Sequence, residues 1–392
     1  MKTRRWTVSL AAMLALGACG DDEERPAAAA SEGSAEEAEA PAAERPLREV
    51  VGTTFEAIPE DATAEIDREK MLLGRRLYHD PALSGDGSVS CATCHMLSHG
   101  GAEPRRSSTG IRGQIGPINS PTVLNAVYNF RQFWDGRAAD LAEQAAGPVS
   151  NPIEMGGDWP TILERLQDDE EYVAAFTSEY GEDGITQENV IDAIVQYESY
   201  LVTPSPFDRW LGGDDDALTE QQQRGLRTFM STGCHACHSG RNLGGLNYQK
   251  LGAVNDYFER RGGELTEADQ GRFNVTQNED DRHKFKVPTL RNVAITSPYF
   301  HDGHEPNLAG AVRTMAHVQL GQELTDAQVA DIVAFLGALT GEIPADAYMP
   351  GAAGSEAATT PGEPDAEDVV EAHPEAPVPA EEDDADRGEA AE

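Results

Sequence analysis

The residues best suited to chemistry in this chain form two copies of one five-residue motif, Cys-x-x-Cys-His. Their members are Cys91, Cys94, His95, Cys234, Cys237 and His238. This spacing is the attachment pattern of c-type haem, in which two thiols bond to the haem vinyl groups and the histidine ligates the iron. A redox disulfide or a zinc site is the alternative, but only one other cysteine remains to complete a zinc site. The motifs therefore predict two covalently bound c-type haems.

The remaining cysteine, Cys19, ends a predicted export signal. Residues 1–19 begin with Lys2, Arg4 and Arg5 and continue through an apolar run that is too short to span a membrane. The run closes in Leu-Gly-Ala-Cys, which resembles a bacterial lipobox, so we expect a lipidated Cys19 and a membrane anchor. An ordinary signal peptide that ends near a cysteine is the alternative.

Two acidic segments flank the body of the chain. Residues 20–49 and 350–392 are rich in Ala, Glu, Asp and Pro and hold almost no large apolar residues. Such segments bury too little surface to offset their ordering entropy, so we expect a disordered linker and a disordered tail. Acidic residues also outnumber basic ones between these segments, within a net charge of −39 for the whole chain. This charge argues against a nucleic-acid partner.

Helical patterns dominate the body, and no stretch alternates in the way that a strand does. Apolar residues recur at helical spacing in residues 64–80, 186–202, 218–230 and 325–341. The last three begin with the N-cap candidates Thr186, Thr219 and Thr325, and the last is expected to stop at Gly341. The predicted fold class is mainly α.

The helices also indicate how the body divides. Each half has a helix before its Cys-x-x-Cys-His motif and an apolar closing helix, which is a weak internal repeat. The two prolines in residues 202–210 mark a joint. We therefore expect two cytochrome c-like haem domains with long loops, residues 50–205 and residues 206–349.

Two longer runs carry a specific resemblance. Residues 116–157 and 285–304 closely resemble bacterial dihaem cytochrome c peroxidases, and the resemblance extends over residues 65–340. It implies a low-potential peroxidatic haem in the N-terminal domain. It also implies a high-potential, His/Met-ligated haem in the C-terminal domain that receives electrons. As in c-type cytochromes, haem attachment outside the cytoplasm is implied, which agrees with an export signal and a periplasmic location.

The resemblance implies a role for several single residues. Met315 matches the axial methionine of the second haem. A thioether ligand stabilises ferrous iron and raises the potential. His317 is the rival ligand, while Met349 lies beyond the last predicted helix. Trp134 matches the tryptophan between the two haems.

The reacting pocket needs a group that moves protons, because peroxide loses a proton from one oxygen and gains one on the other. Glu154 matches the distal glutamate of the family and Gln144 its distal glutamine. Glu143 is adjacent to Gln144 but is expected to point elsewhere on the helix. Further along, the resemblance implies an interdomain calcium site at Asn119, Thr296 and Pro298, which would offer hard oxygen ligands.

One position departs from the family pattern. Most relatives have a removable distal histidine ligand in the loop before Gly116, where this chain has Ile111. Isoleucine cannot ligate iron, and His99 is expected on the proximal side. The peroxide side of the first haem is therefore expected to lack a protein ligand.

Together these features predict an enzyme that reduces hydrogen peroxide with electrons from a small cytochrome c or copper protein, and that could form a homodimer. Two alternatives remain. A dihaem oxidase that modifies a partner protein, as in methylamine-dehydrogenase maturation, has Tyr in place of Met on the second haem. A non-catalytic electron carrier would leave Glu154 and Gln144 without a purpose.

Overall fold

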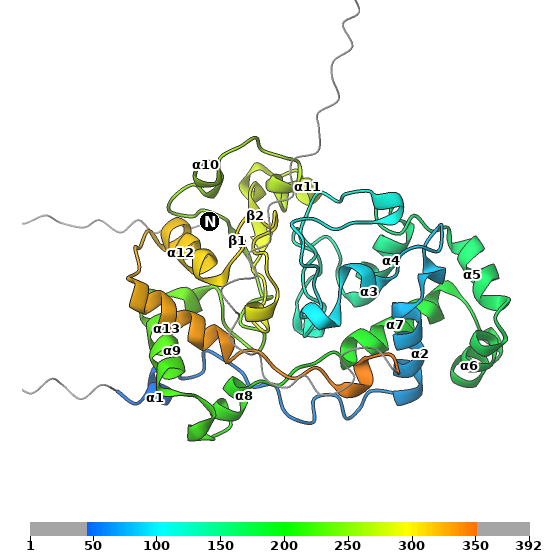
Figure 1. Cartoon of the computed structure of the whole chain (residues 1–392), viewed down its shortest axis with the longest axis horizontal. Helices are drawn as coiled ribbons and strands as arrows, with labels where there is room; N and C mark the ends of the chain where they lie inside the picture. Colours follow the sequence, from blue (N-terminus) through cyan, green and yellow to red (C-terminus); the bar gives the residue numbers. More distant parts are fainter. Residues whose placement is uncertain (1–44, 351–392) are drawn as a thin grey trace, which may run out of the picture. The chain divides into compact units, whose positions relative to one another are not determined.

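Helices carry nearly all of the regular structure in residues 45–350, the part of the chain that the computed structural model describes (Figure 1). The α-helices are α1 Leu47–Val51, α2 Arg68–His79, α3 Cys91–Cys94, α4 Leu141–Ser150, α5 Trp159–Gln167, α6 Glu170–Tyr180, α7 Gln187–Tyr200, α8 Pro206–Leu211, α9 Glu220–Thr232, α10 Tyr257–Arg261, α11 Phe273–Thr276, α12 Leu308–Leu320 and α13 Asp326–Gly337. The mainly α fold is confirmed. The export signal with Cys19, residues 20–44 of the linker and the tail from residue 351 lie outside the described residues.

The sequence did not predict the two short strands. β1 (Tyr248–Lys250) and β2 (Lys284–Lys286) pair antiparallel, with Tyr248 opposite Lys286. Each strand has only three residues, which is too short for an alternating pattern to stand out. The pair nevertheless matters, because β2 lies on the wall of the cavity beside the second haem motif, which is described below.

The three predicted N-caps are confirmed. The hydroxyl of Thr186 accepts from Asn189 N, that of Thr219 from Gln222 N and that of Thr325 from Gln328 N, at the starts of α7, α9 and α13. The stop expected at Gly341 is misplaced, because α13 already ends at Gly337. A Cβ at position 341 would lie 2.3 Å from Thr203 O, so this glycine permits a close backbone approach instead.

Each half of the body is built on a pair of closely packed helices. In the first pair, α2 meets α7, and a Cβ at Gly74 would lie 1.8 Å from Ala193 O. In the second pair, α9 meets α13, and a Cβ at Gly225 would lie 1.8 Å from Asp331 O. Both pairs need a glycine where the backbones touch. The expected internal repeat is therefore present in the packing as well as in the motifs.

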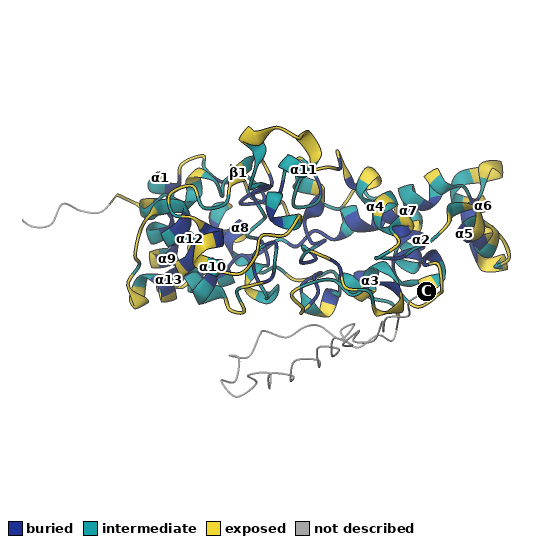
Figure 2. Ribbon diagram, turned by 90° about the horizontal axis from the view of Figure 1, so that it is seen from above, coloured by how far each residue is buried: buried dark blue, intermediate teal, exposed yellow. Residues whose placement is uncertain are grey.

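The hydrophobic cores follow these pairs. One core packs α2, α7 and the first motif, and its buried members include Leu77, Phe176 and Ile194. Another core packs α9 and α13 and includes Leu226 and Phe335. Toward the rim, α5 and α6 bury one face and expose the other, which Figure 2 shows as neighbouring dark and yellow segments.

Each end of the described chain packs against the half of the body that is farther from it in sequence. Helix α1 begins inside segment 20–49, which was expected to be disordered, and its Leu47 and Val51 join the core of α9 and α13. At the other end, Ala347 joins a core with Tyr78 and Tyr197 of the first half. The division into residues 50–205 and 206–349 therefore stays a prediction.

A buried ion pair holds the joint between the halves. Asp208 of α8 receives both terminal nitrogens of Arg291 at 2.8 Å, and it also accepts from the Ile58 backbone N–H at 2.7 Å. Burial alone would raise the pKa of Asp208, but the Arg291 guanidinium lowers it overall. Both side chains are nearly inaccessible to solvent, so neither charge has water as a substitute partner.

Candidate active site

The first haem motif lies on α3, directly beside the α2–α7 core. Cys91 packs against this core, and the Tyr78 hydroxyl donates to the carbonyl oxygen of His95 at 2.8 Å. Burial lowers the pKa of the His95 imidazole, which keeps the ring neutral. A neutral imidazole is the form that ligates iron. The motif therefore meets the requirement for a proximal ligand.

The second motif follows the C-terminus of α9. Its histidine, His238, shares a hydrogen bond of 3.1 Å between Nδ1 and the carbonyl oxygen of Leu243. This contact orients the ring and leaves Nε2 for a metal. Burial lowers the pKa of His238 to about 4, so the ring is neutral at physiological pH.

A cavity of about 260 Å³ adjoins the second motif and fits a haem. Cys234, Cys237 and His238 lie on its wall, and Met315 of α12 lies on the same wall. Most of the other lining side chains are apolar: Phe229, Leu290, Leu308, Val312, Ile332 and Leu336. An apolar slot with two thiols, an imidazole and a thioether suits a porphyrin with a His/Met-ligated iron.

The rival ligands lie outside this cavity wall. His317 pairs through Nδ1 with Glu323 at 2.6 Å and does not line the cavity. Met349 does not line it either, and its neighbours Ala347 and Tyr348 pack on the first half. These placements support Met315 as the axial ligand.

Trp134 reaches the same cavity from the loop before α4. Its indole Nε1 donates to the carbonyl oxygen of Asn119 at 2.9 Å, and its own carbonyl oxygen accepts from Lys286 N at 2.8 Å. The preceding residue, Phe133, lines both this cavity and a second one near Glu154. The Phe133–Trp134 step therefore connects the two cavities.

The three expected calcium ligands also lie on the wall of the cavity beside the second motif. Asn119, Thr296 and Pro298 all line it. The Asn119 amide donates to Arg105 O at 3.0 Å, which directs its nitrogen away and leaves Oδ1 available. The structure brings the three residues together, and a calcium ion there stays a prediction.

Glu154 lies in a second cavity, of about 300 Å³, with Phe133, Arg137, Glu143, Pro148 and Asn151 in its wall. Burial raises the pKa of the Glu154 carboxyl, while Arg137 and a 2.9 Å hydrogen bond from Asn151 partly oppose that rise. Glu154 lies near the first motif, close enough for its charge to act on the Cys94 thiol. Burial, Glu103 and Glu154 together raise the pKa of this thiol to about 12.

Glu143 does not lie as the helix pattern predicted, and the role of Gln144 stays a prediction. Glu143, which was expected to point elsewhere, lines the cavity of Glu154, and its carboxylate accepts from Ala139 N at 2.7 Å. Gln144 is half-buried on α4 and is not among the lining residues. A capping contact at the first turn of α4 turns Glu143 toward this cavity, and the sequence pattern alone did not reveal it.

Ile111 is buried in the loop that approaches Glu154. Its backbone N–H donates to the Glu154 carbonyl oxygen at 2.8 Å, and its Cδ1 lies against Gly156. The two nearby histidines have other partners: His99 Nε2 pairs with Ser297 O at 2.7 Å, and His79 Nδ1 pairs with Arg75 O at 2.9 Å.

The repeat supports the prediction that the first haem lacks a protein ligand on its peroxide side. Asn125 and Asn292 both adopt a left-handed conformation, as do Phe133 and Phe300, and the helices α4 and α12 then follow at the same distance. The eighth residue of α12 is Met315 and the eighth residue of α4 is Pro148. Proline offers no side-chain donor to iron, and Pro148 lines the cavity of Glu154. Aligning the two halves would have revealed this position.

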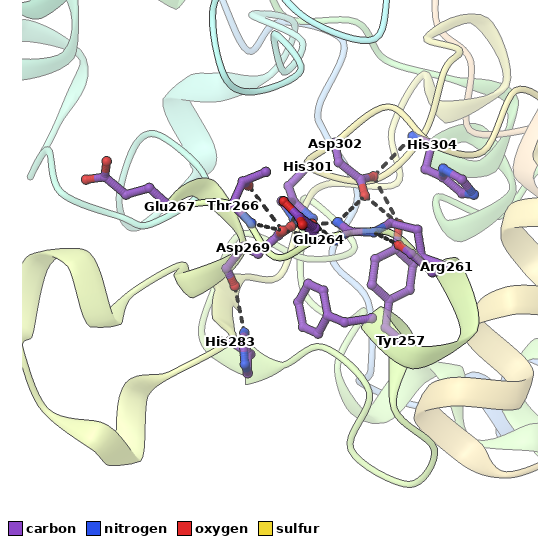
Figure 3. A network of polar contacts seen from close by, with 12 residues as sticks. Tyr257, Arg261, Glu264, Thr266, Glu267, Asp269, His283, His301, Asp302 and His304 are labelled. Carbon is purple, nitrogen blue, oxygen red and sulfur yellow. Dashed lines mark hydrogen bonds and ion pairs between the residues drawn. The ribbon is translucent and has the colours of Figure 1, made fainter.

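A polar network includes His301, which lines the cavity beside the second motif (Figure 3). Asp269 accepts from His301 Nε2 and from Arg261, both at 2.7 Å, and Arg261 also pairs with Asp302 at 2.9 Å. Burial would raise the pKa of Asp269, but His301 and Arg261 hold it well below its usual range. The guanidinium already supplies the positive charge between the two carboxylates, so this is an ion-pair network.

Comparisons with known proteins agree with this site. The family model described as di-haem cytochrome c peroxidase matches residues 68–216. Cytochrome c peroxidase Ccp of Escherichia coli is 50% identical over 277 residues, which are 70% of this chain and 59% of that protein. Cytochrome c551 peroxidase of Pseudomonas aeruginosa is 43% identical and covers 81% of this chain, which spans 93% of it. The chain belongs to the di-haem cytochrome c peroxidase family, so its two motifs bind two c-type haems.

A solved structure supports the fold. The chain is similar to a MauG-like protein associated with microbial copper homeostasis, with a TM-score of 0.65 and 27% sequence identity. The match covers 75% of this chain and 94% of that one. The expected pair of cytochrome c-like units with long loops therefore agrees with a known arrangement.

Proposed function

We propose that this chain reduces hydrogen peroxide to water, with two electrons and two protons consumed for each peroxide. The observation that carries the proposal is the half-buried Glu154, which has a raised pKa and lies near the first haem motif. A carboxyl group with a raised pKa in a cavity is suited to exchange protons near neutral pH. Proline at position 148 leaves room for peroxide on that side.

Each bound haem supplies a redox-active iron, and the protein's residues supply the proton transfer and the positioning. Glu154 would take a proton from one oxygen of peroxide and return it to the other oxygen, which would depart as water. Asn151 donates to Glu154 Oε1 at 2.9 Å and fixes the orientation of the carboxyl group. Gln144 is proposed as a second polar contact for peroxide, on the basis of the family resemblance.

The second half supplies electrons in this proposal. The Met315 thioether stabilises ferrous iron and sets a high potential at the entry site. Trp134 lies on the wall of that cavity and is held by Asn119 and Lys286, so it is positioned to conduct between the haems. A calcium ion at Asn119, Thr296 and Pro298 would hold Asn119 in place. Because Trp134 donates to Asn119, the ion would also help to position Trp134.

The proposed partners are hydrogen peroxide and a small cytochrome c or copper protein as the electron donor, with a homodimer as the proposed assembly. We also propose that the protein works in the periplasm and is anchored through a lipidated Cys19. Within residues 45–350, no helix combines the length and the apolar character that a bilayer crossing needs. The anchor can be tested with Cys19→Ala, which should release the protein from membranes into the soluble fraction.

The two alternatives are less supported. The cytochrome c peroxidases of Escherichia coli and Pseudomonas aeruginosa are 50% and 43% identical to this chain, whereas the MauG-like solved structure is 27% identical. Met315 on the wall of the second haem cavity argues against an oxidase that needs a tyrosine ligand there. A carrier without catalysis would have no use for Glu154.

A steady-state assay with peroxide and a reduced small cytochrome c tests the function. We expect peroxide-dependent oxidation of the donor, with two donor molecules oxidised for each peroxide. Oxidation of a partner protein's side chains, without net donor turnover, would favour the oxidase alternative. Electron exchange with the donor at a rate that does not depend on peroxide would favour the electron carrier.

A further inference from the structure

The side chain of Lys286 is buried on the wall of the second haem cavity without a charge partner. The residue is 7% exposed and lines the cavity. Among residues 45–350, no hydrogen bond or ion pair joins its ammonium to another side chain. Burial lowers its pKa to about 8. An isolated buried ammonium is costly, because it loses its hydration and gains nothing in return.

The charges on this cavity wall differ from those of the rest of the protein. The chain has 69 acidic and 30 basic residues. The cavity wall reverses this ratio, because Lys250 and Lys286 line it and no aspartate or glutamate does. A wall with two ammonium groups, no carboxylates and a largely apolar surface suits a ligand that is flat, apolar and negatively charged at its edge.

The haem that Cys234 and Cys237 bind is such a ligand, since its only charged substituents are two propionate carboxylates. We propose that the Lys286 ammonium is the counter-ion of a propionate of the second haem, and that Lys250, which is exposed, assists at the rim of the cavity. The inference rests on haem attachment at this motif and extends the site by a residue that the ligand set does not include.

The position of Lys286 gives this contact a consequence for electron transfer. Its backbone N–H donates to the Trp134 carbonyl oxygen at 2.8 Å, so one residue contacts both the proposed electron bridge and the haem edge. Neutralising a propionate removes negative charge near the iron, which favours the ferrous state and raises the potential. Lys286 is therefore a positioning and tuning residue that acts together with Met315.

The chain offers a matched set of variants. Lys286→Met removes the charge and keeps an apolar stem of similar length, and Lys286→Arg keeps the charge. Lys284→Met is the control, because Lys284 lies on the same strand but pairs with Asp281 at 3.1 Å and does not line the cavity. The readouts are the mass of each haem adduct and the reduction potential of each haem, measured by spectroelectrochemistry.

We expect Lys286→Met to retain both haem adducts and to shift the ferric–ferrous equilibrium of the second haem toward ferric by about tenfold. For one electron this corresponds to about 59 mV. Lys286→Arg and Lys284→Met should stay close to the unmodified protein. If Lys286→Met carries both haems and its potential equals that of Lys284→Met, the inference is wrong while the proposed function stands. A missing second adduct in the unmodified protein would instead overturn the haem site.

If Lys286→Met does not attach its haems, a measurement on the unmodified protein tests the proposed propionate contact instead. A propionate partner keeps Lys286 protonated, so the potential of the second haem should be flat between about pH 7 and pH 9. An unpaired Lys286 would lose its proton near its lowered pKa of about 8, and the potential would fall as the pH rises. Lys286→Arg stays charged and reports the slope that arises from the rest of the wall, where the other ionisable side chains are Lys250, His238, Tyr299 and His301. A slope in the unmodified protein that Lys286→Arg lacks would overturn the proposal.

Discussion

The backbone N–H of Lys286 donates to the carbonyl oxygen of Trp134, 2.8 Å away. This bond ties strand β2, on the wall of the second haem cavity, to the loop that precedes α4. One residue earlier, Phe133 lines the cavity of Glu154. The second haem cavity and the cavity of Glu154 are therefore joined through two consecutive residues, Phe133 and Trp134.

Glu154→Gln should lower peroxide turnover by roughly 10²–10⁴-fold, because it keeps the size of the side chain and removes the proton-transfer group. Burial raises the pKa of Glu154, so the carboxylate forms only above its usual range. The acid limb of the pH profile of kcat/KM should rise with pH through this raised pKa, and the variant should lose that limb. Glu143→Gln, in the same cavity wall, is the control and should stay within about tenfold of the unmodified protein. A loss of less than tenfold in Glu154→Gln would reassign the residue to structure.

Met315→His should leave both haems attached and lower the potential of the second haem, because imidazole favours ferric iron relative to a thioether. Spectroelectrochemistry of the purified protein measures this shift. His317→Gln is the matched control, since His317 pairs with Glu323 away from the cavity. An unchanged potential in Met315→His, or a shift in His317→Gln, would show that the ligand is misassigned.

The first haem should be high-spin in the fully oxidised protein, and peroxide should react without prior reduction. Pro148 and Ile111 offer no ligand, and His99 Nε2 pairs with the carbonyl oxygen of Ser297. Electron paramagnetic resonance of the oxidised protein measures the spin state. Two low-spin signals would reveal a capping residue. Ile111→His is expected to create a low-spin first haem whose activity depends on prior reduction.

Asp208→Asn should cost about 3–5 kcal/mol of unfolding free energy, because it leaves the buried Arg291 without a counter-charge. Denaturant unfolding of the haem-loaded protein measures this loss. Asp215→Asn removes the partner of Arg48 in an exposed pair and should cost about 1 kcal/mol or less. Equal effects of the two substitutions would contradict a structural role for the buried pair.

The buried carboxyl group of Glu198 should make the stability of the protein depend on pH. Glu198 is 5% exposed, and burial raises its pKa to about 8. Between its usual pKa and this value the folded state binds more protons than the unfolded state, so stability should fall as the pH rises. The slope is at most about 1.4 kcal/mol per pH unit. Melting temperatures at several pH values should show that Glu198→Gln flattens this dependence. Glu188→Gln, at an exposed position of the same helix, should not, and a similar slope in both variants would exclude Glu198 as its source.

The sequence predicted those features that local chemistry determines. The haem motifs have a fixed spacing, and the N-caps Thr186, Thr219 and Thr325 need only a hydroxyl a few residues before an apolar run. Met315 and Glu154 were assigned through the family resemblance, because a single methionine or glutamate does not by itself indicate a functional site.

The remaining features depend on tertiary contacts. The sequence gives no sign that Lys286 is buried, and its position becomes clear only when β2 is seen on the cavity wall. Glu143 joins the cavity of Glu154 because it caps the start of α4. Pro148 can be recognised as the counterpart of Met315 only when α4 is compared with α12. The crossing of α1 and Ala347 between the two halves has no local sequence signal.

The central claim is that peroxide reduction beside Glu154 draws an electron from the Met315-ligated haem. Stopped-flow mixing of protein with a reduced second haem and one equivalent of peroxide tests it directly, with the second haem followed by its ferrous absorbance. We predict that this absorbance disappears as fast as peroxide is consumed, and that Glu154→Gln slows both processes together. A second haem that stays reduced while peroxide is consumed, or one that is oxidised at the same rate in Glu154→Gln, would contradict the claim.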